Sequence, residues 1–441
     1  MYYSGGNEGT PFTKAVRLKL LYYLMKAPHR LGGCDLELSK LILKKKILCL
    51  FPLHDRAVTT QILDSAFSYQ SYPWTLPFFD LKEYFGEKIT LYYVFIGHYS
   101  WWLIWPCIIG LIFQLVVWGQ GNFSSPVLPF YSLVITVWSI FMLEYWKRLE
   151  ATTAMQWGMS NFEQHEPDRP EYRGDLIKSY IDGSEMLYYP SDQVKTKIIK
   201  SEIVIASFIL MVIGVVASIY ALRFSLETSI GSNASLVASI LNTVQITVIN
   251  TIYQIIAVAL TNAENHRTDT QYEDAMIVKL FLFQFINSYA SFFFLAFIAM
   301  NLDKSPDTPS NFVGQCGATN CMQPLSINLA IIFGTRLTLT NFLDIFVPYV
   351  TYKMKIKKET EGVEAGKYLS PPEQDFMLMS YDPLIEGIKN YADTAVQYGF
   401  SLLFITALPC ASFFSLLSNY VKVKCNLWKL STVSLLLLFL E

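Results

Sequence analysis

The sequence predicts an all-α integral membrane protein, because its charges are few, unevenly placed and separated by long apolar stretches. Of the 441 residues, 52% are apolar and 16% are charged, against about 25% charged in an ordinary soluble domain. Asp, Glu, Lys and Arg are missing from 89–143, 203–222, 228–263, 280–302, 308–335 and 394–421. A helix needs about 20 mostly apolar residues to cross a bilayer, whereas soluble helices carry charge on their outer face.

These stretches predict seven good spans and an eighth. The first is long enough for two spans with a turn at 119–126, and the next four supply the third to sixth spans. The last supplies the seventh, and a helix after Pro409 the eighth. We therefore expect a short cytoplasmic N-terminal region at 1–88, a transmembrane domain at 89–430 and an apolar tail at 431–441 that is too short to span.

Lysine and arginine indicate the orientation of the spans. The loops after spans one, three and five contain almost none, with Arg223 and Lys304 as exceptions. The loops on the other side contain Lys147, Arg148, Arg169, Arg173, Lys178, Lys195, Lys197, Lys200, Lys353, Lys355, Lys357, Lys358 and Lys367. The positive-inside rule makes this second side cytoplasmic, together with the N-terminus.

Further signals fall on the opposite side. Asn122 and Asn233 begin glycosylation sequons, which are frequent by chance. Cys316 and Cys321 lie in the third loop of that side, where an oxidising compartment would favour a disulfide. A reduced pair or a metal site is the alternative. The sequons suggest passage through the secretory pathway and leave open whether the protein resides in the plasma membrane or an endomembrane.

Polar side chains recur on one helical face in three consecutive predicted spans, at intervals of three or four residues. They are Thr243, Thr247, Asn250, Thr251 and Gln254 in span four, Gln284, Asn287, Ser288 and Ser291 in span five, and Thr335, Thr338 and Asn341 in span six. Such a stripe either hydrogen-bonds to a neighbouring helix or faces water. Contact between helices is the commoner use of any single residue, but three stripes in succession favour a hydrophilic groove.

Arg336 lies within the sixth predicted span. A guanidinium there costs about 2.5–3.5 kcal/mol on insertion scales, so it needs a wet cavity, a partner or a route to the interface. It would attract anions in a pore. A structural pair with Asp344, or a side chain that reaches the interface, is an equal alternative.

Oxygen-bearing side chains near spans six and seven raise the question of a cation site. Asp344 precedes Pro348 by four residues, and Asn390 and Asp393 share one helical face. Calcium prefers six to eight oxygen ligands, so this set is thin, and Asp393 near a helix start is more often a cap. No nucleophile with its base, phosphate loop or zinc motif is present, which argues against an enzyme. The net charge of −2 and the lack of a basic stripe argue against a nucleic-acid partner.

Seven short motifs, taken together and in order, resemble those of the anoctamin family of chloride channels and phospholipid scramblases. They are FPLHD at 51–55, EYFGEKI at 83–89, EYWKR at 144–148, ENHRT at 264–268, FINSY at 285–289, CGATNCM at 316–322 and VQYGF at 396–400. The resemblance runs from about residue 17 to about residue 430.

The resemblance implies a helical bundle of ten membrane helices, usually dimeric, of which seven to eight are present here. It also implies a groove lined by helices three to seven that passes chloride or other anions, phospholipid headgroups or both. The residues expected to line it are Thr243, Thr247, Asn250, Gln254, Gln284, Asn287, Ser288, Arg336 and Thr338.

The chain departs from the pattern of the family members that calcium gates. Those members carry an Asn and an acid on helix six, two acids on helix seven and two on helix eight. The matching positions here are Asn341 (or Thr340) and Asp344, then Asn390 and Asp393, then Lys422 and Asn426. An ammonium beside a divalent cation is repelled, which disfavours calcium as a cofactor, though it stays possible. Lys422 instead becomes a candidate tether between Asp344 and Asp393, and a degenerate site is the alternative.

The second departure is length. After residue 430 the chain matches nothing in the family, and the last two helices, which hold most of the dimer contact, are not found. A homodimer is therefore an open expectation, and so is a truncated gene product. The leading interpretation is a passive protein that conducts chloride or scrambles membrane lipids without ATP. The alternative is a non-conducting membrane scaffold or tether, or a degenerate, truncated family member.

Overall fold

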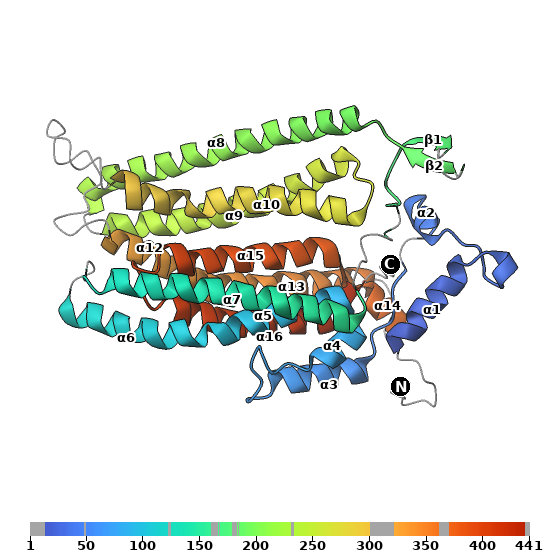
Figure 1. The fold of residues 1–441 in the computed structure, drawn as a ribbon, viewed down its shortest axis with the longest axis horizontal. Helices are drawn as coiled ribbons and strands as arrows, with labels where there is room; N and C mark the ends of the chain where they lie inside the picture. The colour runs from blue at the N-terminus through green and yellow to red at the C-terminus, as the bar shows by residue number, and fades with distance from the viewer. Residues whose placement is uncertain are drawn as a thin grey trace. The chain divides into compact units, whose positions relative to one another are not determined.

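The structure is a computed structural model that describes residues 14–47, 50–121, 125–159, 166, 168–178, 183, 185–230, 233–299, 322–360 and 370–436. Most of these residues are helical (Figure 1). Asn122, Cys316, Cys321 and the end of the apolar tail, 437–441, lie outside the described residues. The side chain of Asn233, the first residue of α9, also lies outside them.

The chain divides into two compact units. The first consists of Met1–Ile104, Arg336–Asn390 and Leu416–Glu441, and the second of Trp105–Thr335 and Tyr391–Ser415. Helices α15 (Pro383–Leu403) and α16 (Ala411–Thr432) contribute residues to both units.

The first unit begins with short helices and ends with a small sheet. Asp55 caps α3, since its Oδ1 accepts a hydrogen bond from the Ala57 amide at 3.1 Å. Gly86 separates α4 from α5 with φ +89°, which favours glycine. Its elements are α1 (Lys14–Lys26), the 3₁₀ turn His29–Leu31, α2 (Leu38–Leu43), α3 (Arg56–Phe67), α4 (Phe78–Phe85), α5 (Glu87–Trp102), the π-helical turn Arg336–Thr340, α13 (Asn341–Thr360), α14 (Pro371–Phe376), and strands β3 (Met379–Tyr381) and β4 (Ser434–Leu436), which pair in parallel.

His54 ties distant parts of this unit together. Its Nε2 lies 2.8 Å from the carbonyl oxygen of Ser434, and its backbone amide donates to the Asp375 carboxylate at 3.0 Å. Its Nδ1 lies 2.8 Å from the hydroxyl of Tyr84, which also accepts from the Asp55 amide at 3.2 Å. The segment before α3 is thereby joined to α4, α14 and β4.

The second unit is built on long helices that pack side by side. It contains α6 (Ile104–Gln120), α7 (Leu128–Trp157), the antiparallel strands β1 (Asp175–Lys178) and β2 (Glu185–Tyr188), α8 (Ser191–Ile230), α9 (Asn233–Glu264), α10 (Asp269–Phe293), the π-helical turn Phe294–Ala299 and α12 (Met322–Thr335). Helices α8, α9 and α10 contact one another along their length (Figure 1). Stacked rings of Tyr253 and Phe283, 3.7 Å apart at their centroids, fill the space between α9 and α10, with Phe208 of α8 at their edges.

Six helical segments of the described chain are long and apolar enough to cross a membrane. They are Glu87–Gln120, Leu128–Trp157, Ser191–Arg223, Leu236–Glu264, Asp269–Ile298 and Met322–Glu359. They coincide with the first six predicted spans, so the all-α membrane fold is confirmed. The seventh and eighth predicted spans are helical, as α15 and α16. Neither is among the helices that are apolar enough to cross a membrane, and α15 carries three charged residues, Glu386, Lys389 and Asp393.

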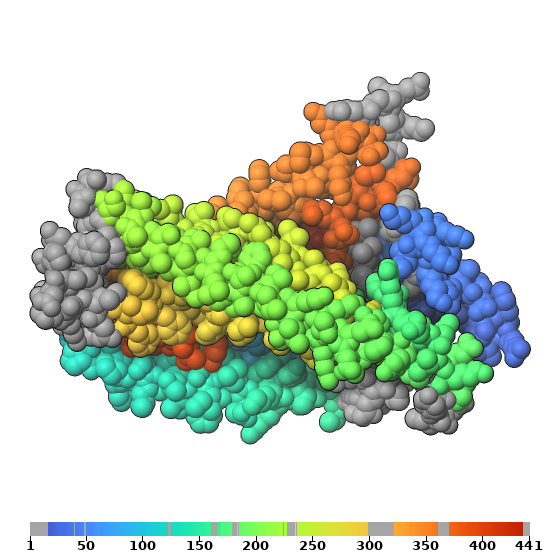
Figure 2. All heavy atoms as spheres, turned by 90° about the horizontal axis from the view of Figure 1, so that it is seen from above, coloured from blue at the N-terminus to red at the C-terminus, as the bar shows by residue number. Residues whose placement is uncertain are grey.

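The outer face of α8 is apolar and uncovered. Ile203, Leu210 and Ile213 are exposed there, and Figure 2 shows the helix uncovered along this face. An exposed apolar surface along a long helix suits contact with lipid chains rather than with water.

Candidate functional site

The polar stripes of α9 and α10 meet in a buried network of side-chain amides. Asn287, fully buried on α10, donates to Oδ1 of Asn250 at 2.8 Å and to the carbonyl oxygen of Ile246 at 3.2 Å. Its own Oδ1 accepts from Nε2 of Gln245 at 2.7 Å. About one turn further along α10, Ser291 accepts a hydrogen bond from Nδ2 of Asn242 at 3.0 Å. Hydrogen bonds between helices therefore account for part of the stripe.

The same region contains buried oxygens that the described protein groups leave without a hydrogen bond. They belong to Asn242 (Oδ1), Gln245 (Oε1), Gln284 (Oε1) and Ser288 (Oγ). Gln284 and Ser288 lie one turn apart on α10 and are 6% and 0% exposed. A buried polar atom without a partner costs about 1–3 kcal/mol, so these atoms indicate a place for water or a polar permeant.

The outer row of the α9 stripe behaves differently. Thr247 and Thr251 are exposed, and their hydroxyls donate to the carbonyls of Thr243 and Thr247 in their own helix. Thr243 is buried and donates to Ser239, while Gln254 is half-buried. The α9 stripe therefore has an inner row that contacts α10 and an outer row that faces away from the packed helices.

The sixth span is interrupted by a π-helical turn at Arg336–Thr340. Arg336 is half-buried and Thr338 is exposed. Asn341 is buried, and its Nδ2 donates to the carbonyl of Leu337 in the same helix at 3.0 Å. π-Helical turns inside α-helices occur frequently at functional sites. The π-helical turn begins at Arg336, the residue that the sequence singled out in this span.

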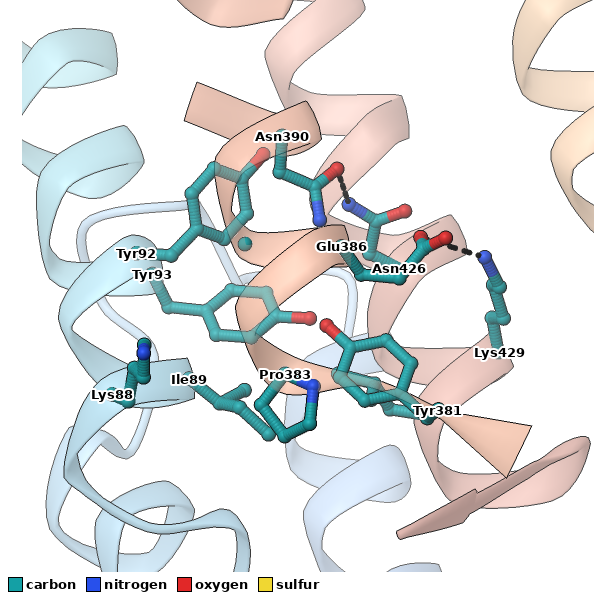
Figure 3. Close-up of a pocket in the computed structure, with 12 residues that line it drawn as sticks. Lys88, Ile89, Tyr92, Tyr93, Tyr381, Pro383, Glu386, Asn390, Asn426 and Lys429 are labelled. Atoms are coloured by element: carbon teal, nitrogen blue, oxygen red, sulfur yellow. Dashed lines mark hydrogen bonds and ion pairs between the residues drawn. The ribbon is translucent and has the colours of Figure 1, made fainter. Parts of the chain in front are cut away.

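Part of the predicted cation site lies in a pocket of the first unit (Figure 3). Nδ2 of Asn426 on α16 donates to Oδ1 of Asn390 on α15 at 3.4 Å. Next to them, Nζ of Lys429 lies 3.3 Å from the Glu386 carboxylate. The pocket is lined by Lys88, Ile89, Tyr92, Tyr93, Tyr381, Pro383, Glu386, Gly387, Asn390, Asn426, Lys429 and Leu430.

Tyrosines give the pocket neutral walls. Figure 3 shows the hydroxyls of Tyr93 and Tyr381 directed toward one another. Burial raises the pKa of the Tyr381 phenol well above its ordinary value, so this group stays protonated. Glu386 is the acidic side chain among the lining residues, and Lys429 neutralises it.

These residues do not fit a calcium site. Calcium needs several carboxylate oxygens, whereas here one amide oxygen already accepts from its neighbouring amide, and Lys422 stands half-buried on the same helix as Asn426. Asp344 is half-buried on α13, and Asp393 belongs to the second unit. Among the described residues, no three His, Cys, Asp or Glu side chains gather as metal ligands would.

A buried charge cluster between α9 and α10 did not emerge from the sequence. Nζ of Lys279 and Nε2 of His266 lie 2.7 and 2.8 Å from the same carboxylate oxygen of Glu264. Glu264 is 0% exposed and Lys279 is 7% exposed. In the sequence, Glu264 and Lys279 stand out only as opposite charges near the facing ends of consecutive predicted spans.

The match to known families decides the wider assignment. The family model of the anoctamins, described as a calcium-activated chloride channel, matches residues 81–434. The chain belongs to the anoctamin family. Anoctamins are channels and scramblases rather than enzymes, and the seven motifs found in the sequence are consistent with this membership.

Individual relatives are distant. Human anoctamin-7 is 26% identical over 95% of this chain and 54% of its own length. Mouse anoctamin-5 is 24% identical over 97% of this chain and 56% of its own length, and human anoctamin-10 is 26% identical over 90% and 58%. This anoctamin therefore spans about half the length of the curated relatives it matches.

Proposed function

We propose that this anoctamin is a passive transport protein that moves chloride ions, phospholipids or both along a hydrated path beside α9 and α10. The description of its family as a chloride channel supports the anion, and the apolar surface of α8 suits a protein that works within lipid.

One observation carries the proposal. Gln284, Ser288, Gln245 and Asn242 each keep a buried oxygen without a hydrogen bond from the described protein. A scaffold gains nothing from such atoms, because each would destabilise the fold by about 1–3 kcal/mol. Water or a passing headgroup removes this cost. The four oxygens therefore support a wet path better than a sealed helix contact.

We also infer that calcium does not gate this path. In the first unit Asn390 and Asn426 form a hydrogen-bonded amide pair, and the resemblance to calcium-gated members implies acids at these two positions. We propose that Lys422, half-buried on α16, supplies a positive charge in place of the ion. If Lys422→Glu leaves the basal transport rate unchanged, the idea that Lys422 substitutes for calcium is wrong.

The orientation is part of the proposal. The loops rich in Lys and Arg between α7 and α8 and after α13 face the cytoplasm, together with the N-terminal region. Trypsin added to sealed vesicles of known orientation would then cut these loops only from the cytoplasmic face. Cleavage from the opposite face would reverse the assignment.

Reconstitution tests the function. The purified chain is placed in liposomes that hold fluorescent phospholipid, and quenching by dithionite reports lipid movement while a chloride electrode reports anion release. We expect lipid or chloride to move faster than in empty liposomes, at the same rate with calcium and with chelator. Rates equal to those of empty liposomes, from protein that remains folded, would favour the scaffold.

A further inference from the structure

The segment that follows α7 is fastened to the turn between α9 and α10. We call residues 166 and 168–173 the connector, and we call residues 265–268 together with the first four residues of α10 the turn. Both belong to the second unit, and about a hundred residues of chain separate them. Contacts over such a separation are not a consequence of local chain geometry, so they require a structural explanation.

Hydrogen bonds to backbone groups of the connector hold the two segments together at two points. Asn265, which has φ +62°, donates through Nδ2 to the carbonyl of Arg173 at 2.8 Å and accepts from the Arg173 amide at 3.0 Å. The amide of Arg169 donates to the carbonyl of Arg267 at 2.9 Å. The side chain of Asn265 thus satisfies a donor and an acceptor of the connector in the way a neighbouring strand would.

Charges of opposite sign also meet across the contact. Nε of Arg267 donates to Oδ1 of Asp168 at 2.6 Å, and this hydrogen bond raises the pKa of the Arg267 guanidinium. The carboxylate of Glu166 accepts from the amide of Thr270 at 2.9 Å. Thr270 lies in the first turn of α10, where backbone N–H groups point outward and favour a negative charge. The connector therefore caps α10 from outside the helix.

Arg169 lies at the centre of the contact. Its side chain is 13% exposed, and its Nε lies 2.7 Å from Oδ1 of Asp269, the first residue of α10. Its guanidinium stacks on the ring of Tyr272 at 3.9 Å, and Tyr272 is 3% exposed. A planar cation held by a carboxylate and an aromatic face is a geometry that Lys cannot reproduce.

We propose that Arg169 is a positioning residue that locks the turn between α9 and α10 and so sets where these two helices begin and end. The buried pair of Glu264, the last residue of α9, and Lys279 of α10 joins the two helices next to the turn. Asn287 follows Lys279 by eight residues, about 12 Å along a rigid helix. A shift of the turn therefore moves α10 as a rod and changes the amide network and the partnerless oxygens beside it. This inference rests on the proposed function for its effect on transport, but the lock itself does not.

Hydrogen exchange measures the lock without reference to transport. In the full chain, Arg169→Ala should speed amide exchange about tenfold in the peptides that cover the connector and the turn, since a cation–π contact and an ion pair are lost. Arg169→Lys should give an intermediate rate. Lys147→Ala, which removes an exposed ion pair with Glu144 on α7, is the matched control and should leave both peptides unchanged. Unchanged exchange of the turn in Arg169→Ala would overturn the lock.

Transport is then measured with the same variants in liposomes. The expected rate differs from that of the unsubstituted chain by about two- to thirtyfold in Arg169→Ala, the range found for residues that couple through packed elements. Faster exchange together with an unchanged transport rate would overturn the positioning role. If the unsubstituted chain moves neither chloride nor lipid, the proposed function falls separately, and the exchange result alone decides whether Arg169 locks the turn.

Discussion

Asn287 of α10 and Gln245 of α9 are joined by a hydrogen bond of 2.7 Å, from Nε2 of Gln245 to Oδ1 of Asn287, within the buried polar network of this helix pair. Asn287 also donates to Asn250 and to the carbonyl of Ile246, so its side chain forms hydrogen bonds with three groups of α9. This residue therefore fixes the rotation of the two helices about their axes.

Truncating Asn287 should destabilise the protein. Asn287→Ala leaves Gln245 and Asn250 without their partner and should lower the free energy of unfolding by about 1–3 kcal/mol. Thermal unfolding in detergent would measure the loss. Thr251→Ala, at an exposed position on α9, is the control and should have little effect. Equal unfolding temperatures for both variants would show that the network contributes nothing.

Removing one charge of the buried pair of Glu264 and Lys279 should destabilise the protein more than removing both. Lys279→Met leaves the buried Glu264 carboxylate without its lysine, with His266 and Ser201 still beside it, at a cost of about 3–5 kcal/mol. The double variant Glu264→Gln, Lys279→Met removes both charges and should recover most of the loss. Urea unfolding of the single and double variants measures the difference. A double variant no more stable than Lys279→Met would mean that the charge is not the cause.

Tyr84 should make stability depend on alkaline pH. Burial raises the pKa of its phenol above the usual value of about 10, because the folded protein resists the phenolate. The stability that depends on the neutral phenol is thus fully present below pH ~10 and is lost as the pH rises above it. Tyr84→Phe should have a flatter stability curve than the unsubstituted chain above this pH, and Tyr69→Phe, at a 95% exposed position, should not. Parallel curves for all three proteins would contradict the assignment.

Restoring acids should create calcium sensitivity. The triple variant Asn390→Glu, Asn426→Asp, Lys422→Glu replaces an amide pair and an ammonium with carboxylates, which calcium prefers. Its transport rate in liposomes should then depend on calcium, while that of the unsubstituted chain should not. A calcium response already present in the unsubstituted chain would refute the calcium-independent gating proposed here.

The sequence predicted the parts of the structure that depend on local pattern. The first five stretches free of charge correspond to the six helical segments that are long and apolar enough to cross a membrane, because length and hydropathy alone decide that property. The face of α10 that carries Asn287 was also predictable from its period. Its partner was not, because Gln245 faces it only at one rotation of α9, which packing sets.

Contacts between distant segments could not be predicted from the sequence either, because they too are set by packing. Glu264 and Lys279 marked the ends of spans, and nothing local indicates that their side chains meet. Arg169 counted only toward the positive charge of its loop, whereas the structure buries it against Tyr272. The strands β3 and β4 are too short to carry an alternating pattern. The resemblance to the family points to Asn390 and Asn426, but nothing in the sequence indicates the hydrogen bond between them.

The central claim is that a hydrated path runs beside α9 and α10, and we propose that the outer polar row of α9 borders it as the buried oxygens of the inner row do. Thr247 and Val248 are adjacent, and both are exposed on this helix. The decisive measurement is the initial rate of lipid and chloride movement in liposomes for Thr247→Trp and for Val248→Trp. The account predicts a rate about tenfold lower in Thr247→Trp, a rise of ~1.4 kcal/mol in the barrier, and an unchanged rate in Val248→Trp. Equal rates in the two variants would contradict it.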